Sequence, residues 1–350
     1  MPEPARAGRV AGTLALALVA ALVAERLRLP LPWMIGPLLA VALAGVLGAR
    51  VDCPTPLRNA GQWVIGTALG LYFTPAVLAT IVALAPALAV GIVWALLAGL
   101  LFYALLARVS GATSAEERAT AYFAAAIGGA SEMAVLGERH GGRIDRIAMA
   151  HSLRVLIVVV AIPIGLQWSG LHGVDVFVPG PTRVDFGGLL LLGALTLAGS
   201  LVMRRFGLPN PFVLGSMAVG IALTGSGVEL SALPPAVSHA GQLLIGCALG
   251  ARFTPDFVHS APRWLAAVAL GACALIGLSA GFAWVLASLA GLPWATVLLG
   301  TSPGGVAEMC ITAKVLQLGV PVVTAFHVTR YLAVLLCTPP LYRWLERRRG

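Results

Sequence analysis

The sequence predicts an all-α polytopic membrane protein made of two inverted repeats, each with about five transmembrane helices plus one re-entrant or broken helix. Three observations support this fold class. Long segments carry almost no charge, a series of motifs occurs twice, and Lys and Arg are distributed unevenly among the loops. Together they place most of the chain inside a lipid bilayer.

The composition is that of a chain whose surroundings are lipid. Of its 350 residues, 59% are hydrophobic and 11% are charged, and the mean hydropathy is +0.93. A soluble domain does not need so much apolar surface. Segments long enough to cross a hydrocarbon layer of roughly 30 Å are residues 10–23, 77–107, 147–167, 189–203, 264–289 and 320–341.

The N-terminal segment has two interpretations. Arg6 and Arg9 precede an apolar core, as in a secretory signal. Residues 186–205 form a counterpart of this segment in the second half of the chain. We therefore expect the segment to be retained as the first helix.

Net charge and cysteine content exclude two other classes of protein. A charge of +9 would suggest nucleic-acid binding in a soluble protein. Here the basic residues lie in short loops between apolar segments, as the positive-inside rule describes, so we expect no nucleic-acid partner. The five cysteines are dispersed and form no CxxC motif. We interpret them as reduced packing residues that imply neither a metal nor a disulfide framework.

The two halves of the chain carry the same motifs in the same order. Residues 29–36 recur at 208–215, and residues 60–75 recur at 240–255 with 11 of 16 positions identical. The offset between copies is 179 to 180 residues early in the chain and 176 later, so one short deletion near residues 112–119 aligns them. The first membrane repeat is predicted at residues 5–168 and the second at residues 184–345.

The orientation of the second repeat depends on two glycine pairs, Gly128-Gly129 and Gly304-Gly305. If both surrounding segments cross the membrane, the repeats are parallel, and the basic residues of the loops divide 11 to 10 between the two sides. If both segments are re-entrant, the second repeat is inverted, and the division becomes 17 to 4. The positive-inside rule favours the inverted arrangement, with both termini in the cytoplasm.

The inverted arrangement assigns each basic residue of the loops to one side. The 17 cytoplasmic residues are Arg6, Arg9, Arg50, Arg58, Arg108, Arg118, Arg139, Arg143, Arg146, Arg204, Arg205, Arg252, Arg263, Arg343, Arg347, Arg348 and Arg349. The four outer residues are Arg26, Arg28, Arg183 and Lys314. Arg154 and Arg330 are predicted to lie within membrane spans.

The paired glycines are the first candidates for ligand binding. Inverted repeats with glycine-interrupted segments at corresponding positions are typical of secondary transporters, whose sites lie near the midplane of the bilayer. Gly128-Gly129 and Gly304-Gly305 would let the chain turn tightly, so that freed backbone groups face a solute or an ion. We expect these glycines to have positive φ or to allow a close approach of the backbone.

Glu132 and Glu308 follow the glycine pairs at the same position of each repeat, and Ser131 precedes Glu132. They are the only carboxylates that we place at membrane depth. An acid there is expected to carry a proton, bind a cation or contact a substrate. The alternative is a paired structural acid, or one at a tip that water reaches.

His151 and Arg154, and likewise His327 and Arg330, are spaced i, i+3 and should share one helix face directed away from lipid. Each Arg could keep the nearby Glu ionised and supply positive charge for an anionic substrate. The alternatives are snorkelling to the headgroups, a structural salt bridge to Glu, and a histidine that is merely packed.

Gln62 and Gln242 also recur, in the motif Ala-Gly-Gln-x-x-Ile-Gly. Small neighbours permit close helix approach, so each Gln could form an interhelical hydrogen bond or contact the substrate. The chain has no GxxxxGK[ST] loop, no HExxH motif and no pair of histidines spaced i, i+4. We therefore expect no cofactor, no metal and no enzymatic activity.

At these motifs the chain resembles the membrane AbrB family, the "AbrB duplication" proteins of bacteria. The resemblance covers roughly residues 10–345 and includes the Gly-Gly-x-x-Glu-Met sequence of both halves. It implies little about function, since such proteins are labelled ammonia monooxygenase or regulator of gene expression and are suspected transporters. The monooxygenase label lacks support. Oxygen chemistry needs a metal or an organic cofactor site, and we identify neither in the sequence.

The sequence thus predicts a multi-pass protein of the bacterial inner membrane whose partners are the lipid bilayer, a small-molecule solute and a coupling ion. We expect a proton- or sodium-coupled secondary transporter of a small anionic or zwitterionic metabolite. The alternative is a membrane sensor or regulator that affects gene expression indirectly, and a monooxygenase ranks third. Substrate identity, direction of transport and homo-oligomerisation stay open.

Overall fold

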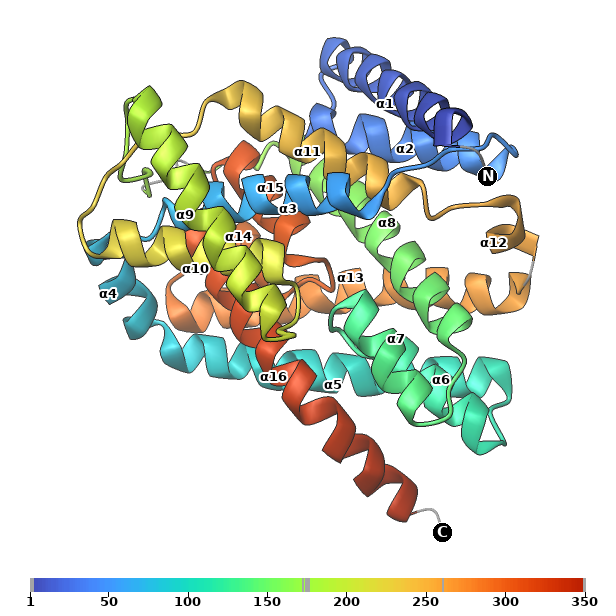
Figure 1. Ribbon diagram of the computed structural model, residues 1–350. Helices are drawn as coiled ribbons and strands as arrows, with labels where there is room; N and C mark the ends of the chain where they lie inside the picture. The colour runs from blue at the N-terminus through green and yellow to red at the C-terminus, as the bar shows by residue number, and fades with distance from the viewer. Residues whose placement is uncertain (1–2, 172, 174–176, 260, 349–350) are drawn as a thin grey trace. The chain divides into compact units, whose positions relative to one another are not determined.

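The computed structural model describes residues 3–171, 173, 177–259 and 261–348. All regular secondary structure in these residues is helical (Figure 1). The helices are α1 (Glu3–Arg26), α2 (Pro32–Val46), α3 (Thr55–Gly70), α4 (Pro75–Ala83), α5 (Ala85–Ser110), α6 (Ala115–Ala125), α7 (Ala130–Arg139), α8 (Ile144–Trp168), α9 (Phe186–Arg205), α10 (Pro211–Gly225), α11 (Pro235–Gly250), α12 (Pro255–His259), α13 (Pro262–Ala290), α14 (Trp294–Thr301), α15 (Val306–Leu316) and α16 (Val320–Arg347).

Six of the helices in the described part of the chain are long and apolar enough to cross a membrane: α1, α5, α8, α9, α13 and α16. Each contains most of a segment predicted from the sequence. The pair α3 and α4 passes the same test together, although the two helices are bent by 88° at the break between them. Two further apolar helices, α2 and α10, have 15 residues each. An all-α membrane fold is therefore confirmed.

One predicted segment is wrong in its extent. Residues 77–107 were expected to form one span, but the helix is interrupted at Leu84, and α4 and α5 are separate. Pro86 lies in the first turn of α5, where its missing N–H is not needed. The same proline would disrupt the interior of a continuous helix, because it removes a hydrogen bond and clashes with the preceding turn.

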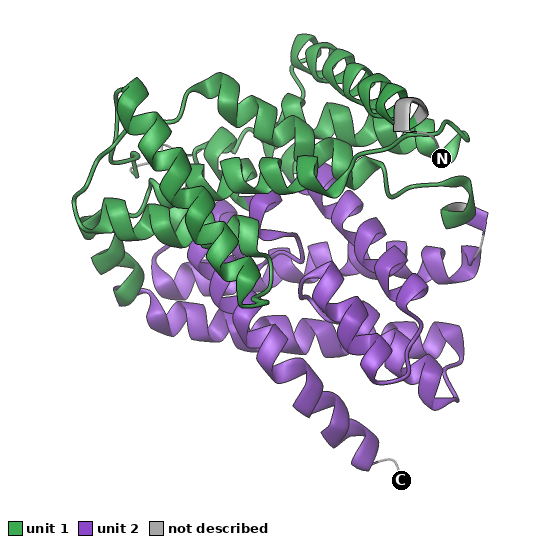
Figure 2. Ribbon diagram, viewed as in Figure 1, with its two compact units in different colours: residues 1–82, 163–258, 310–321 green, residues 83–162, 259–309, 322–350 purple. Residues whose placement is uncertain are grey.

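The chain forms two compact units that do not follow the two sequence repeats (Figure 2). Unit 1 contains residues 1–82, 163–258 and 310–321, and unit 2 contains residues 83–162, 259–309 and 322–350. Each unit therefore combines segments of both repeats. The helices α8 and α15 begin in unit 2 and end in unit 1.

Unit 1 is packed by reciprocal contacts between equivalent helices. Helix α2 packs against α1 and α11, and its counterpart α10 packs against α9 and α3. Gly66 of α3 lies so close to the Val213 carbonyl of α10 that a Cβ atom would overlap it, and Gly246 of α11 lies in the same way against the Met34 carbonyl of α2. The glycines of the Ala-Gly-Gln-x-x-Ile-Gly motif thus allow the helices to approach closely, as the sequence predicts.

Unit 2 holds both segments that the sequence marks as interrupted. Helix α5 packs against α6 and α13, and α13 packs against α14. Aromatic and small residues fill its core, among them Phe102, Tyr122, Phe123 and Trp264. Ser114 and Glu117 form a capping box that starts α6, while Gly111 and Gly291 end α5 and α13 in the left-handed conformation. These signals set the start of α6 and the ends of α5 and α13.

Candidate functional site

Both glycine pairs interrupt a helix, as the sequence predicts. Helix α6 ends at Ala125, the backbone is extended at Ala126, and α7 begins after Gly129. In the second repeat α14 ends at Thr301, Ser302 is extended, and α15 begins after Gly305. We call the residues 126–129 the first break and the residues 302–305 the second break. Both lie in unit 2.

The first break reverses the direction of the chain. Gly137 in α7 lies against the Phe123 side chain in α6. Beyond the end of α7, the backbone N–H of Arg143 donates a hydrogen bond of 2.9 Å to the Thr120 hydroxyl in the middle of α6. Helix α7 therefore runs back along α6, as can be followed in Figure 1. This hairpin is the local geometry that a re-entrant segment requires.

His151 and Arg154 hold the C-terminal end of α6. His151 Nε2 donates to the Phe123 carbonyl at 2.9 Å, and Arg154 Nη1 donates to the Ala126 carbonyl at 2.9 Å. Arg154 Nη2 donates to His151 Nδ1 at 3.0 Å. Because Arg only donates hydrogen bonds, Nδ1 accepts and the ring proton lies on Nε2. The predicted common face of the two side chains is confirmed.

The second repeat forms the equivalent set of contacts. His327 Nε2 donates to the Leu299 carbonyl at 2.8 Å, and Arg330 Nη2 donates to His327 Nδ1 at 2.8 Å. Arg330 also donates to the Ser302 carbonyl and, at 2.7 Å, to the Gly304 carbonyl. The last carbonyls of a helix lack partners within the helix and carry partial negative charge, so a buried cation there stabilises its end.

These contacts exclude one interpretation of the two arginines and add another. Arg154 is 2% exposed and Arg330 is 5% exposed, so neither snorkels to the lipid headgroups. Within the described residues, Arg154 forms no salt bridge to Glu132. Each guanidinium bonds to backbone carbonyls beside a break. The sequence did not suggest these hydrogen bonds from the arginines to backbone carbonyls.

Glu132 and Glu308 occupy the first turn of the half-helix that follows each break. Each carboxylate folds back over the preceding glycine, because a Cβ atom built on Gly129 or Gly305 would overlap it. The N-terminus of a helix favours negative charge, so both acids stabilise the helix that they start. Glu132 is half-buried, and Glu308 is 9% exposed.

The glycines of the breaks lie close to other groups, but their backbone conformation is not unusual. Gly129 has φ −66° and ψ 135°, which other residues adopt readily. None of Gly128, Gly304 and Gly305 is among the residues with positive φ. A Cβ atom on Gly128 would collide with Met133, and one on Gly304 with Met309. Positive φ is therefore wrong, and the groups that crowd these glycines are side chains and not the backbone of another segment.

The other candidate residues are a serine directly after the first break and two glutamines of unit 1. Ser131 is in the first turn of α7 with its side chain exposed. Gln62 in α3 is half-buried and Gln242 in α11 is 5% exposed, and both belong to unit 1. The structure therefore gathers the glycine pairs, the two acids and the His–Arg pairs in one unit, without Gln62 and Gln242.

Tyr331 is a residue of the first break that sequence reasoning missed. It follows Arg330 in α16, and its ring edge lies against Gly129 beside the Glu132 carboxylate. The side chain is 6% exposed. Its counterpart in the first repeat is Val155. This difference between the repeats was the only feature of the sequence that could have drawn attention to Tyr331. Sequence alone could not show that α16 passes the first break.

A small pocket adjoins the same break. Ala126 and Ile127 of the break line it, together with residues of α5 and α16 that include Gly99 and Val334. Its polar lining residues, Tyr122 and Thr338, are joined by a 3.0 Å hydrogen bond from the Tyr122 hydroxyl to the Thr338 carbonyl. The lining suits a hydrocarbon group better than a charge.

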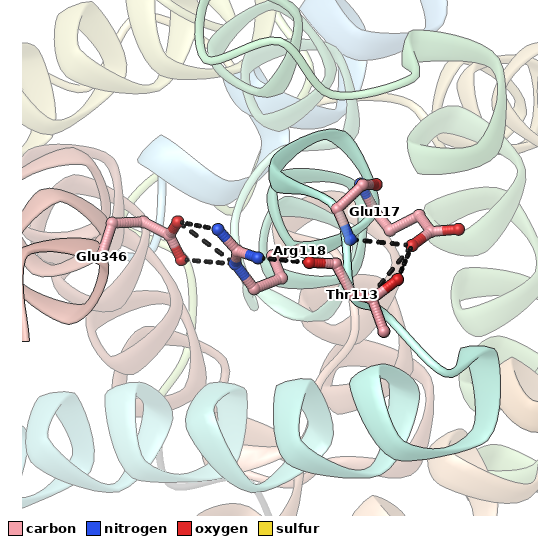
Figure 3. A network of polar contacts seen from close by, with 5 residues as sticks. Thr113, Glu117, Arg118 and Glu346 are labelled. Carbon is pink, nitrogen blue, oxygen red and sulfur yellow. Dashed lines mark hydrogen bonds and ion pairs between the residues drawn. The ribbon is translucent and has the colours of Figure 1, made fainter. Parts of the chain in front are cut away.

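An ion pair at the start of α6 ties this half-helix to the end of α16 (Figure 3). Arg118 Nη2 donates to a Glu346 carboxylate oxygen at 2.7 Å, and Arg118 Nε donates at 3.0 Å to the other oxygen. Arg118 Nη1 also donates to the Thr113 carbonyl at 2.6 Å. Both ends of α6 are thus held by charged side chains from long helices.

Comparison with known proteins gives the family of the chain. A family model described as "Transition state regulatory protein AbrB" matches residues 33–346. "Putative regulator AbrB" of Escherichia coli (strain K12) is 25% identical over 324 residues, which cover 91% of both chains. "Uncharacterized protein YhjN" of Bacillus subtilis (strain 168) is 24% identical over 350 residues, covering 91% of this chain and 88% of the relative. No solved structure matches. Because the family model covers most of the chain, as the duplicated motifs suggested, this protein belongs to the AbrB family.

Proposed function

We propose that this protein is a secondary transporter of a small metabolite in the bacterial inner membrane. The observation that carries the proposal is the pair of helix breaks in unit 2, each followed by an acid in the first turn of a half-helix. Interrupted helices at corresponding positions of two repeats are the usual place where transporters bind their substrates and coupling ions. Six long apolar helices supply the membrane domain that such a site needs.

In this proposal Glu132 and Glu308 bind the coupling ion, which is a proton or a sodium ion. A carboxylate beside an interrupted helix gives either ion an oxygen to bind, with backbone carbonyls as additional ligands. The proposed substrate is anionic or zwitterionic, because the half-helix N-terminus favours a negative group. Transport, and not an enzymatic reaction, is the proposed activity.

The test is substrate flux in proteoliposomes under imposed pH and sodium gradients, after a screen of small organic acids, amino acids and amines. We expect Glu132→Gln and Glu308→Gln to lose the ion dependence of the flux, because an amide neither releases a proton nor attracts a cation. Glu138→Gln is the matched control, since Glu138 lies exposed on the same helix as Glu132. If all three variants keep the rate and ion dependence of the parent, the acids are structural and this mechanism is wrong.

A second candidate function is regulation, favoured by the printed name of the Escherichia coli relative, "Putative regulator AbrB". A membrane protein can alter gene expression indirectly by changing the concentration of a solute. The two functions differ in one measurable respect. A variant that no longer transports should also lose its effect on transcript levels if regulation follows from flux, and should keep it if the protein acts as a sensor.

A further inference from the structure

The two breaks share their acid and their His–Arg pair but differ at one position. Tyr331 lies against Gly129 at the first break, whereas the equivalent residue of the other repeat is Val155. The arginines differ as well. Arg330 donates to two carbonyls of the second break, and Arg154 donates to one carbonyl of the first. Compared with the second break, the first break thus has an additional phenol group, and one fewer of its backbone carbonyls accepts a hydrogen bond from an arginine.

The Tyr331 hydroxyl is the unusual group of this site. It is buried and forms no hydrogen bond. The Glu132 carboxylate lies near enough to interact with it, but the two groups do not reach hydrogen-bond geometry. An unsatisfied buried hydroxyl is destabilising, so its presence calls for an explanation, and a ligand that binds to it is one.

Three kinds of hydrogen-bond donor converge on the first break. One is the Tyr331 hydroxyl, and the second is the N-terminus of α7, whose first N–H groups have no partner within the helix. The third is Arg154 Nε, which is buried without a partner on the guanidinium that bonds the Ala126 carbonyl. In the structure the Glu132 carboxylate folds back over Gly129 and so lies at this N-terminus. The space is therefore already shaped to hold a carboxylate group.

We propose that the first break, and not the second, binds the carboxylate group of a small solute, with Tyr331 as a binding residue, and that this carboxylate displaces the Glu132 side chain from the N-terminus of α7. Two carboxylates at one helix terminus repel each other, so Glu132 takes up one proton from solution on a carboxyl oxygen as the solute binds. No other bond forms or breaks. This inference rests on the proposed transport function and gives it a stoichiometry of one proton per carboxylate.

Other groups on the helix of Glu132 and on three further helices of unit 2 carry charge or can titrate. They are Glu138 and Arg139 on α7 with His140 directly after it, Glu116, Glu117 and Arg118 on α6, His151 and Arg154 on α8, and Arg330, Tyr331, Arg343 and Glu346 on α16. His151 is the group whose titration could imitate that of Glu132. Both of its ring nitrogens are engaged in hydrogen bonds, and a substitution at Glu132 separates the two.

The test measures binding without flux. The purified full-length protein in detergent is titrated with sodium acetate, sodium succinate or sodium phosphate against sodium chloride of equal ionic strength. The rise in melting temperature gives an apparent Kd at about pH 5.5 and about pH 8. For the parent we expect acetate or succinate to bind at least about tenfold more tightly at the lower pH, because binding takes up a proton.

The variants give the proposal its sharpest prediction. Glu132→Gln should bind the carboxylate at the higher pH as tightly as the parent does at the lower pH, since the amide imitates the protonated acid. Tyr331→Phe should weaken binding about tenfold at both pH values, through loss of one hydrogen bond to a charged group. Tyr342→Phe is the matched control and should bind like the parent, since Tyr342 is a tyrosine of the same helix that is also 6% exposed.

Four results would overturn the inference: no shift with acetate or succinate for the parent, a stronger shift with phosphate than with either, unchanged pH dependence in Glu132→Gln, or equal affinities of Tyr331→Phe and Tyr342→Phe. Failure of the transport proposal looks different. A parent that binds succinate but moves no solute contradicts the transport function alone, whereas a parent that moves amines and binds no carboxylate contradicts this inference alone.

Discussion

At the scale of single residues, the charges of unit 2 match the helix ends that they contact. Arg154 and Arg330 bond to carbonyls at the C-terminal ends of α6 and α14, where the helix dipole is negative. Glu132 and Glu308 lie at the N-terminal ends of α7 and α15, where it is positive. A charge in an apolar environment is costly unless it is compensated, and the broken helices supply that compensation.

The first prediction concerns the glycine that precedes each acid. Gly129→Ala places a Cβ atom where the Glu132 carboxylate and the Tyr331 ring edge lie, and Gly305→Ala displaces the Glu308 carboxylate. Each variant should lose about 1 kcal/mol of stability, because its acid no longer interacts with the helix N-terminus. The measurement is the thermal unfolding midpoint in detergent, followed by size-exclusion chromatography of heated samples.

Gly281→Ala is the control for this prediction. Gly281 lies within α13, and nothing lies within 4 Å of the position of its missing Cβ. Alanine is the better helix former there by roughly 0.5–1 kcal/mol, so this variant should unfold at a higher temperature than the parent. Equal shifts in all three variants would mean that the break glycines do not position the acids.

At the scale of the elements, α6 is a short helix held at both ends. Its start is fixed by the Ser114 capping box and by the Arg118–Glu346 ion pair, and its end by His151 and Arg154. Eleven residues make a marginal helix in isolation, so such contacts contribute a large share of its stability. They also bring the start of the first hairpin to the end of α16.

The second prediction tests the ion pair shown in Figure 3. The side chains of Arg118 and Glu346 are 22% and 24% exposed, so solvent screens the pair only in part. Arg118→Glu or Glu346→Arg alone should destabilise unit 2 by about 1 kcal/mol, and the double exchange should recover part of the loss. Recovery stays incomplete, because the bond from Arg118 to the Thr113 carbonyl is not restored.

Thermal unfolding of the parent, both single variants and the double variant forms a double-mutant cycle that isolates the pair. Arg143→Ala is the control. Its ion pair with Asp145 joins side chains that are 47% and 54% exposed and only two residues apart, so its loss should be close to neutral. Additive effects of the two single exchanges would show that the Arg118–Glu346 contact does not connect α6 to α16.

Much of the helix content was predictable from local signals, and the interruptions were less so. Helix α9 has the predicted bounds of 186–205, because Asp185 caps its start and Gly207, just after its end, takes the left-handed conformation. The interruption at Leu84 was missed, since the residues on both sides of it are apolar. Hydropathy measures how apolar a segment is and does not reveal a change of direction such as the 88° bend between α3 and α4.

The candidate site was predictable where the chemistry lies in the sequence, and missed where it lies in the backbone or in tertiary contacts. Repetition identified Glu132, Glu308 and the His–Arg pairs, because both copies preserve their spacing. It could not identify the carbonyls of Ala126 and Ser302 as partners of the arginines, because every residue has a carbonyl. Tyr331 escaped for the opposite reason, since only one repeat has it.

At the scale of the whole molecule, the compact units and the sequence repeats divide the chain differently. Unit 1 requires α2 and α3 of the first repeat together with α10 and α11 of the second, and each pair buries surface against the other. Neither repeat alone contains a complete unit. Reciprocal packing of this kind follows from any twofold relation between the copies, parallel or inverted, so it leaves the orientation of the second repeat as a prediction.

The last prediction is that the two repeats have opposite orientation in the membrane. The division of basic loop residues, 17 to 4, favours inversion over the parallel arrangement, and the reversal of the chain between α6 and α7 is the local geometry that a re-entrant segment would need. Arg139 at the end of α7 and Gln317 after the end of α15 are both exposed. In a cysteine-free background, Arg139→Cys should react with a membrane-impermeant maleimide only from the cytoplasmic side, and Gln317→Cys only from the outer side.

Labelling of inside-out and right-side-out vesicles decides this, with each variant serving as the control for the sealing of the other's vesicles. If both cysteines react from the same side, the two repeats have the same orientation. The parallel arrangement, with its even division of basic residues, is then the correct one.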